Sequence, residues 1–279
     1  MEEKEDKLAA ARRKIGKLQH AIVAFSGGVD STLVAKICHD ELGGNALAVT
    51  AISPSYPRYE LEQAEKTAKA IGIRHVTVTT KEMEKKEYRD NTPARCYFCK
   101  TTLYQELNEV ARRTGYKNIL NGINADDAHD YRPGMKASTE FNVLSPLKDA
   151  GITKSEIVEI AKSLGLPNWN KPASPCLSSR VPYGTAITDK ILGKIEKAEE
   201  ALRELGIRQF RVRYHKEIAR IEVNKEDFLI VLENAERISR TFREIGFAYA
   251  CLDIRGFKSG NLNEMIADET RENKSIALR

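Results

Sequence analysis

The stretch Ala21-Ile-Val-Ala-Phe-Ser-Gly-Gly-Val-Asp-Ser-Thr32 decides the fold of this chain. Residues 21–25 are apolar and short enough to form a buried strand, and a helical pattern follows from about Asp30 to Leu42. Between them the chain breaks at Ser26-Gly27-Gly28. A strand that passes through glycines into a helix presents unsatisfied N–H groups at the helix N-terminus, where the helix dipole also favours an anion. The stretch therefore predicts a phosphate-binding turn.

The side chains of this turn suit the same purpose. Gly27 and Gly28 let a phosphate approach the backbone closely, and Ser26 and Ser31 offer hydroxyl donors. Asp30 beside an anion implies a Mg²⁺ ion between the two. An ordinary strand–helix turn with a polar cap is the alternative. No lysine follows the glycines as in the Walker pattern, and the spacing resembles the SGGxDS signature of the PP-loop ATP pyrophosphatases. That resemblance implies ATP, cleaved between its α- and β-phosphates.

Composition limits the class of protein. The chain has 279 residues, of which 41% are hydrophobic and 30% charged, as in water-soluble globular proteins. No apolar run is as long as a membrane span, and residues 1–17 lack the apolar core of a signal peptide, so we expect a cytoplasmic protein without a membrane partner. The net charge of +5 fits a small polyanionic substrate and does not demand nucleic acid.

Alternating strands and helices predict an α/β fold. Further buried strands are expected at 45–53, 74–80 and 118–123, with helices at 57–72 and 100–114. This alternation favours a parallel sheet covered by helices on both faces, with ligands bound at the carboxyl ends of the strands. Residues 128–139, with Pro133-Gly134, are expected to form a surface loop that could close over a ligand. We expect the nucleotide to contact residues from three loops at this edge: Ser26, Gly27, Gly28, Asp30, Ser31, Thr50, Gly122 and Asp126. For Asp126 an Asx turn is an equal alternative.

Five cysteines make an odd count, and with a reducing compartment they argue against a disulfide framework. Cys96 and Cys99 have the spacing of ligands for zinc or an iron–sulfur cluster, or of a dithiol pair. Cys176 lies in an irregular segment with three prolines, 171–184. Cys38 and Cys251 sit within apolar runs, which predicts core positions for both.

The pattern changes after Tyr183. A helix at 188–205, two strands within 209–223, a helix at 225–245 and a strand at 247–254 indicate a small α+β domain. The expected domains are therefore 1–185 and 186–279. Arg211 and Arg213 alternate on one strand and so share a face, where guanidinium groups could bind a phosphate. A solvated strand face is the alternative.

Taken together, five motifs resemble those of the LarE family over nearly the whole chain. They are SGGVDS, RCYFCK, NGINADD, PCLSSRVPYG and the segment from Asp253 to Glu264. Members of that family are ATP-dependent sulfur transferases, which convert both carboxylates of pyridinium-3,5-biscarboxylic acid mononucleotide to thiocarboxylates for the nickel-pincer cofactor of lactate racemase. In one branch the cysteine that matches Cys176 gives up its own sulfur. In another, cysteines matching Cys96, Cys99 and Cys176 hold a [4Fe-4S] cluster, and this chain, with all three, resembles the cluster branch.

The resemblance implies a Rossmann-like parallel sheet of the PP-loop type, followed by the smaller domain. It implies that ATP converts each carboxylate to an acyl-adenylate, with Mg²⁺ on Asp30, and that the iron without a protein ligand carries sulfide from a sulfide source. Asp30 and Cys176 are the expected catalytic residues. Arg180, Arg211 and Arg213 match the arginines that bind the substrate phosphate, and Glu222 matches an acid associated with a metal. A homo-oligomer is also implied.

Other functions remain open at this point. Some tRNA thiolases also combine a PP-loop with three cluster-binding cysteines, but the modest charge argues against the extended basic surface that tRNA needs. A nucleotide sensor would not require both the intact turn and the three cysteines. Within the sulfur-transfer interpretation, Cys176 could donate its own sulfur, or react beside an unrelated zinc-bound Cys96–Cys99 pair.

Overall fold

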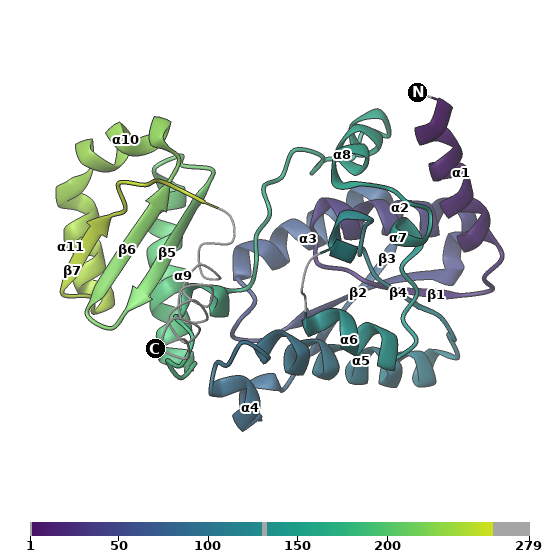
Figure 1. Ribbon diagram of the computed structural model, residues 1–279, viewed down its shortest axis with the longest axis horizontal. Helices are drawn as coiled ribbons and strands as arrows, with labels where there is room; N and C mark the ends of the chain where they lie inside the picture. The colour runs from purple at the N-terminus through teal and green to yellow at the C-terminus, as the bar shows by residue number, and fades with distance from the viewer. Residues whose placement is uncertain (1, 130–132, 259–279) are drawn as a thin grey trace, which may run out of the picture. The chain divides into compact units, whose positions relative to one another are not determined.

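The computed structural model describes residues 2–129 and 133–258, which form two compact units (Figure 1). Unit 1 consists of Met1–Tyr88 and Pro93–Ser174, and unit 2 of Arg89–Thr92 and Pro175–Arg279. The expected boundary near 185 lies inside unit 2. The structure divides the chain earlier because buried Arg180 forms an ion pair with Glu199 of unit 2, which ties the preceding loop to that unit.

Unit 1 is built on a parallel sheet of four strands. In spatial order they are β3 (Arg74–Thr79), β2 (Ala46–Ile52), β1 (Ala21–Ala24) and β4 (Ile119–Leu120). The predicted α/β class is confirmed. Because all four strands run in the same direction, the loops that leave their carboxyl ends meet at one edge of the sheet.

Helices cover both faces of this sheet (Figure 1). The strand β1 shows why: Ala21 and Val23 belong to one core and Ile22, which points the other way, belongs to the second. The first core is covered by α1 (Glu2–Gly16), α2 (Val29–Leu42), α3 (Arg58–Ile71) and α8 (Lys154–Ser163), and the second by α5 (Arg95–Thr114) and α6 (Pro133–Glu140). Short helices α4 (Lys86–Arg89) and α7 (Pro146–Asp149) complete the unit.

Unit 2 packs helices on a three-stranded sheet. The elements are α9 (Asp189–Glu204), β5 (Phe210–His215), β6 (Ile218–Val223), α10 (Phe228–Glu233), α11 (Ala235–Ile245) and β7 (Tyr249–Leu252). The antiparallel β5–β6 hairpin turns at Lys216, and β6 pairs with β7 in parallel. Val212 and Ile221 face a core with Phe242 of α11, so the alternate positions Arg211 and Arg213 lie on the opposite face of the sheet.

Three sequence-based expectations about these elements were wrong. Residues 133–140 form α6 rather than a loop, with Pro133 in the first turn and Ala137 fully buried; residues 130–132 lie outside the described range. The helix expected at 100–114 begins at Arg95. The helix expected at 225–245 is broken at Asn234, whose φ of −103° and ψ of 17° lie outside the helical range, and the two parts are α10 and α11.

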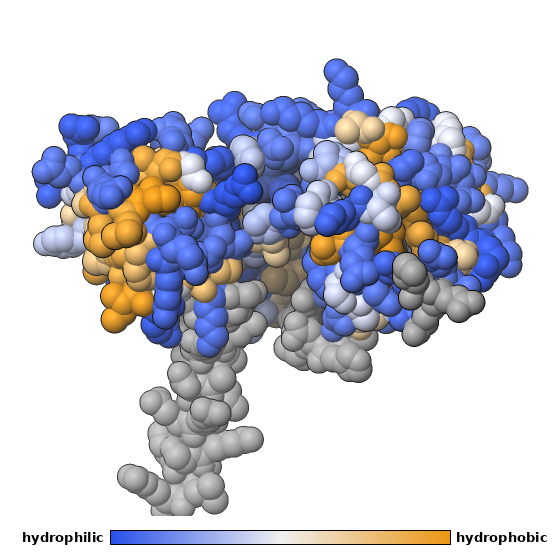
Figure 2. All heavy atoms as spheres, turned by 90° about the horizontal axis from the view of Figure 1, so that it is seen from above, coloured by the Kyte–Doolittle hydropathy of each residue, from blue (hydrophilic) through white to orange (hydrophobic). Residues whose placement is uncertain are grey.

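The surface is mostly hydrophilic, with an apolar patch visible on unit 2 (Figure 2). The large apolar side chains that unit 2 exposes are Ile218, Leu229, Leu232, Tyr249 and Ile254. Within the described residues, no helix has both the length and the apolarity that crossing a bilayer requires.

Asn91 organises the first loop of unit 2. It is fully buried in a left-handed conformation, with φ of 52°. Its Nδ2 donates to the carbonyl oxygens of Val181, Pro182 and Thr185 at 3.2, 2.8 and 3.0 Å. One side chain therefore binds three backbone acceptors of a distant segment, of which the Val181 bond is buried.

We expect Asn91→Ala to lower the free energy of unfolding by about 2 to 4 kcal/mol, because buried carbonyl groups lose their donors. Asn142 is the matched control, since it is exposed and also has φ of 52°. Asn142→Ala carries the same backbone penalty without the buried bonds. Urea titrations of both variants followed by circular dichroism measure the difference, and equal losses would contradict this role for Asn91.

Candidate active site

The turn between β1 and α2 has the geometry of an anion site. Gly27 adopts φ of +65°, and Gly28 is the extended N-cap of α2. The Ser31 hydroxyl donates to the Gly28 carbonyl oxygen at 3.0 Å and accepts the Ser26 N–H at 3.2 Å. These bonds fix the loop just ahead of the first helical turn, whose N–H groups lack partners within the helix.

Two glycines of the site are required by close packing. A Cβ on Gly27 would lie 2.9 Å from the Cβ of Ala64 in α3. A Cβ on Gly122, in the loop after β4, would lie 2.7 Å from the backbone nitrogen of Ser31. The backbone of the turn therefore packs directly against α3 at Gly27, and the backbone of the loop after β4 packs directly against the turn at Gly122.

Three side chains from outside the turn hold its carbonyl oxygens. Tyr56 donates from Oη to the Ser26 oxygen at 3.0 Å, and buried Asn168 donates from Nδ2 to the Gly27 oxygen at 2.9 Å. Burial and the Glu60 carboxylate raise the pKa of Tyr56, so its hydroxyl stays protonated. These donors occupy carbonyl oxygens of the turn, and the N–H groups in the first turn of α2 are the ones suited to an anion.

Lys171 adds a third contact of this kind. Its Nζ lies 3.3 Å from the Gly27 oxygen and 2.6 Å from Oε2 of Glu60 in α3. The ion pair is largely buried, with 17% of the Lys171 side chain exposed. This cation is therefore fixed beside the turn by a carboxylate and a carbonyl.

Asp30 lies in a polar network that joins three segments at the carboxyl edge of the sheet. Its Oδ2 is 2.5 Å from Nζ of Lys154, and its Oδ1 accepts a bond from Nδ2 of Asn124 at 3.3 Å. The backbone N–H of Lys154 donates to Oδ2 of Asp126 at 2.7 Å. Lys154 thus contacts both of the predicted acids, Asp30 and Asp126.

Thr50 is buried beneath the same edge. Its hydroxyl donates to the Phe25 carbonyl oxygen at 2.8 Å and must then accept from Nε2 of His75, also at 2.8 Å. Burial lowers the pKa of His75, which favours the neutral ring with the proton on Nε2. Thr50 therefore links β1, β2 and β3, and its contact with a nucleotide stays a prediction.

The candidate cluster ligands come from both units. Cys96 and Cys99 lie one turn apart at the start of α5 in unit 1, Cys96 exposed and Cys99 half-buried. Cys176 is half-buried in unit 2, directly before a short 3₁₀ turn. Within either unit, no three described His, Cys, Asp or Glu side chains converge on a point that could hold a metal.

The two cysteines expected in the core have different positions. Cys38 is buried in α2, which raises the pKa of its thiol to about 12 and confirms the prediction. Cys251 is exposed, so that prediction was wrong. The reason is strand alternation, because Ala250 and Leu252 pack against the core of unit 2 and Cys251 lies on the opposite face.

Two arginines of unit 2 hold the Cys176 loop. Arg180 forms a bidentate pair with Glu199, at 2.8 and 3.0 Å, and donates to the Cys176 carbonyl oxygen at 3.0 Å. Arg213 donates to the Ser179 carbonyl oxygen at 2.7 Å. Both side chains are buried. The structure thus brings the predicted phosphate-binding arginines and Cys176 into one local arrangement.

Arg211 lies near Arg180 and Arg213, so three guanidinium groups are close together. Burial and the neighbouring Arg180 and Arg213 lower its pKa to about 10, although Glu199 acts in the opposite direction. Glu222 is fully buried; Arg213 and Arg220 engage its two oxygens at 3.0 and 3.1 Å. A bound anion would relieve the repulsion among the arginines. The association of Glu222 with a metal stays a prediction.

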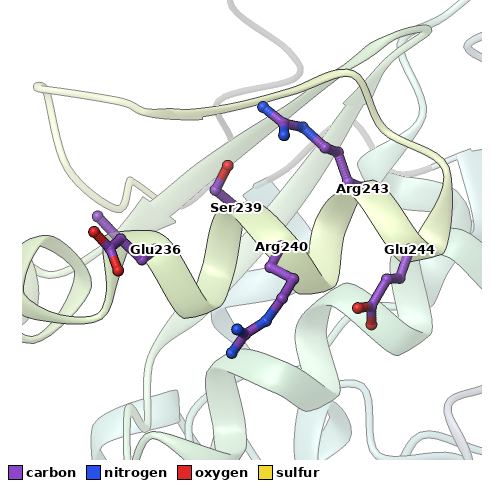
Figure 3. A pocket seen from close by; sticks show the side chains of 6 residues that line it. Glu236, Ser239, Arg240, Arg243 and Glu244 are labelled. Carbon is purple, nitrogen blue, oxygen red and sulfur yellow. The ribbon is translucent and has the colours of Figure 1, made fainter.

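A shallow hollow on unit 2 has a different character (Figure 3). It is lined by residues of α11 alone, and its side chains diverge, with Arg240 and Arg243 pointing to opposite sides of the helix. Nothing in it converges on a ligand atom, and none of the predicted site residues lines it.

Comparisons with known proteins agree with this geometry. A family model described as NAD synthase matches residues 1–115. An uncharacterised Synechocystis protein is 46% identical over 264 residues, 94% of this chain and 98% of its own length. The pyridinium-3,5-bisthiocarboxylic acid mononucleotide synthase of Lactiplantibacillus plantarum is 40% identical over 253 residues, 89% of this chain and 91% of its own. The chain belongs to the LarE family. An uncharacterised Methanocaldococcus jannaschii protein is 31% identical over 87% of this chain and 92% of its own.

Membership of the LarE family, a family of enzymes, confirms the resemblance drawn from the motifs. Motif reasoning predicted site residues at the turn, the cysteines and the arginines of this LarE-family chain, and it did not include Tyr56, Asn168, Lys171 or Lys154. For Lys154 a signal existed, because Thr153 and Glu156 form the capping box of α8 and place Lys154 at a helix start.

We expect Gly27→Ala to lower the melting temperature of the chain more than Gly28→Ala does. The new Cβ at Gly27 would overlap Ala64 and force a left-handed alanine, whereas Gly28 has φ of −80° and its nearest neighbour, the Ser26 hydroxyl, would lie 3.4 Å away. The expected difference between the two variants in the free energy of unfolding is about 1 to 3 kcal/mol, which appears as a difference in melting temperature. Differential scanning fluorimetry measures it, and equal melting temperatures would show that the turn tolerates a Cβ at Gly27.

Proposed function

We propose that this chain is an ATP-dependent sulfur transferase that converts pyridinium-3,5-biscarboxylic acid mononucleotide to the bisthiocarboxylic acid mononucleotide. The observation that carries the proposal is the 40% identity to the Lactiplantibacillus synthase over 89% of this chain. A match of that extent must include residues of both unit 1 and unit 2. A single-domain nucleotide sensor would need only the first.

The first step activates a poor electrophile. A substrate carboxylate oxygen attacks the α-phosphorus of ATP, and the bond from that phosphorus to the oxygen bridging the α- and β-phosphates breaks. Pyrophosphate departs, and the substrate carboxylate becomes an acyl-adenylate. The turn from Ser26 to Ser31 is suited to bind the departing pyrophosphate through the N–H groups at the start of α2. Asp30, with Asp126 nearby through Lys154, supplies the oxygen ligands that Mg²⁺ prefers. Bound Mg²⁺ would supply positive charge against the phosphates.

The second step replaces oxygen by sulfur. Sulfide attacks the acyl carbon, the bond to the AMP oxygen breaks, and AMP leaves with the former carboxylate oxygen. The two steps are repeated for the second carboxylate, so each product consumes two ATP and two sulfides. The substrate's own phosphate requires a separate site, and the positive charge around Arg211, beside Arg180 and Arg213, supports placing it there.

We infer that the sulfur source is a [4Fe-4S] cluster bound by Cys96, Cys99 and Cys176. Thiolates are the normal ligands of such clusters, and the one-turn spacing in α5 suits two of them. Three protein ligands would leave one iron able to bind sulfide. Arg180 and Arg213 fix the loop that carries Cys176 through its carbonyl groups, which leaves the thiol for this role.

Assembly into a homo-oligomer also stays a proposal. Leu229 and Leu232 on α10 expose 68% and 58% of their surface, as residues at a contact between copies would in an isolated chain. Light scattering of the purified protein measures the mass. A monomer at micromolar concentration would contradict this proposal.

Turnover tests the activity. Protein reconstituted with iron and sulfide under anaerobic conditions is incubated with ATP, Mg²⁺, sulfide and the biscarboxylic mononucleotide, and both product and protein are weighed by mass spectrometry. We expect several products per chain, AMP and pyrophosphate release that depends on the mononucleotide, and unchanged protein mass. Loss of one H₂S from the protein in a single turnover would instead indicate that Cys176 donates its sulfur. Absence of thiocarboxylate product would overturn the function.

Cysteine variants test the ligand set. Cys176→Ala and Cys96→Ala are expected to lose the iron content and the EPR signal of the reduced cluster. Cys251→Ala is the matched control, since Cys251 is exposed and belongs to unit 2 but not to the proposed set. A full cluster in Cys176→Ala would exclude that cysteine as a ligand.

A further inference from the structure

Glu82 carries a buried carboxylate whose charge is not balanced within the described part of the chain. It begins the short 3₁₀ turn Glu82–Glu84 that follows β3, and only 2% of its surface is exposed. Its Oε1 accepts a bond from the Ser55 hydroxyl at 3.3 Å, whereas Oε2 is buried and has no hydrogen-bond partner among the described residues. The ion pair of this turn joins Lys81 and Glu84, and no described lysine or arginine pairs with Glu82.

A carboxylate in this position is unfavourable by itself. An ionised group that leaves water loses its solvation, and one hydroxyl bond at 3.3 Å returns little of that free energy. A trapped water molecule would bond to Oε2 of Glu82 but would leave the charge in place. A bound cation would both contact the oxygen and neutralise the charge.

The hydroxyl groups beside Glu82 form an ordered chain. Ser55 donates its only hydroxyl hydrogen to Glu82, so in the 3.0 Å contact between the hydroxyls of Ser53 and Ser55 it is Ser53 that donates. Ser53 in turn accepts the backbone N–H of Ser55 at 3.2 Å. Both hydroxyl dipoles therefore direct their positive ends toward the carboxylate, as they would toward a negative charge. Each serine oxygen keeps one lone pair for a further ligand.

The available oxygens select a class of cation. Glu82 supplies one negative charge, and Ser53 and Ser55 supply neutral oxygens. Protein sites for Ca²⁺ combine several charged oxygens, and Mg²⁺ usually keeps several waters, for which a carboxylate so deeply buried is poorly suited. Among the described residues, no three His, Cys, Asp or Glu side chains come together as a divalent ion would need. One carboxylate with hydroxyl oxygens is instead neutralised by a single positive charge.

The place of these residues in the fold connects them with the phosphate turn. Ser53 and Ser55 follow β2 and Glu82 follows β3, so the three side chains meet at the carboxyl edge of the sheet. The residue after Ser55 is Tyr56, whose Oη donates to the Ser26 carbonyl oxygen at 3.0 Å. The loop that carries the serines therefore also supports the turn.

We propose that Glu82, Ser53 and Ser55 form a binding site for a monovalent metal cation, sodium or potassium. The cation contacts Oε2 of Glu82 and the free lone pairs of the serine oxygens, and it neutralises the buried carboxylate. It stabilises the loop between β2 and α3, and no covalent bond forms or breaks through it. This site is separate from the Mg²⁺ site proposed at Asp30 and does not depend on sulfur transfer.

Melting temperatures in matched salts test the site. The parent chain is heated in potassium, sodium and choline chloride at one concentration, so that only the cation differs. We expect potassium or sodium to raise the melting temperature by about 2 to 5 °C over choline, because an ion that binds only the folded state stabilises it. The salt with the larger rise identifies the ion. Equal melting temperatures in all three salts would overturn the site.

Variants of the 3₁₀ turn show whether the ion binds at Glu82. Glu84→Gln is the matched control, because Glu84 lies in the same turn with 71% of its side chain exposed. We expect Glu84→Gln to retain the difference between the salts and Glu82→Gln to lose it. A difference of the parent's size in Glu82→Gln would place the ion elsewhere and overturn the proposal. Ser55→Ala, with a reduced difference expected, carries the same test if Glu82→Gln does not fold.

Thallium(I) provides a direct probe, since it replaces potassium and scatters X-rays anomalously. Crystals of the parent chain soaked in a thallium(I) salt are expected to show an anomalous peak beside the Glu82 carboxylate. A peak is not expected there in Glu82→Gln. Strong peaks at other positions with none beside Glu82 in the parent would overturn the site.

The link to the phosphate turn has its own measurement. Calorimetry with Mg²⁺ and ATP is expected to show about 5-fold tighter binding in the stabilising salt than in choline chloride for the parent, and no such difference for Glu82→Gln. Equal affinities in the parent would overturn the link between the cation and the turn. A parent that binds no ATP in any salt would overturn the proposed function, whereas the melting and thallium results would still decide the cation site.

Discussion

The close approach of Gly27 to α3 is the contact on which the candidate site depends. With 2.9 Å between a hypothetical Cβ and Ala64, the backbone itself forms the packing surface. Gly122 repeats this arrangement against Ser31 from the loop after β4. Three segments thereby reach one point at the carboxyl edge of the sheet, and the N–H groups that start α2 lie there. A larger side chain at either position would push these segments apart.

Charge is arranged differently in the two units. At the turn of unit 1, Lys154 balances the charge of Asp30, and Lys171 balances that of Glu60. In unit 2, burial lowers the pKa of Arg211, and the neighbouring Arg180 and Arg213 lower it further. In unit 1 the N–H groups at the start of α2 favour an anion, and in unit 2 the group of buried arginines favours one. Two phosphate-containing molecules, a nucleotide and a mononucleotide, would match these two sites.

The buried carboxylate of Glu199 has a structural part in this scheme. It binds Arg180 through both oxygens and also accepts the backbone N–H of Val212 in β5 at 3.1 Å. The carboxylate thus connects the loop of Cys176 with the strand that carries the neighbouring arginines. Because such a pair is buried, removing one partner would leave an uncompensated charge. The position of Cys176 within unit 2 follows from this network.

Local pattern was sufficient for much of the fold and for part of the site. The apolar run before Ser26 and the glycines after it predict the strand–turn–helix, because strand formation, left-handed backbone and helix capping are properties of a few neighbouring residues. Residues 133–140 and Cys251 were misassigned for the opposite reason. Their structure depends on contact with α5 and on which face of β7 meets the core, and neither is written in the local sequence.

The sequence by itself thus determined the parallel α/β class, the strand–turn–helix at Ser26 and the family, and it predicted a phosphate site and three cluster-binding cysteines. Only the tertiary structure decided which side chains support them. Asn168 reaches Gly27 across 141 positions and Lys154 reaches Asp30 across 124, so no periodicity or motif spacing links these pairs. The reason is physical: hydrogen bonds and ion pairs depend on distance in space, and chain packing sets that distance after the local elements have formed.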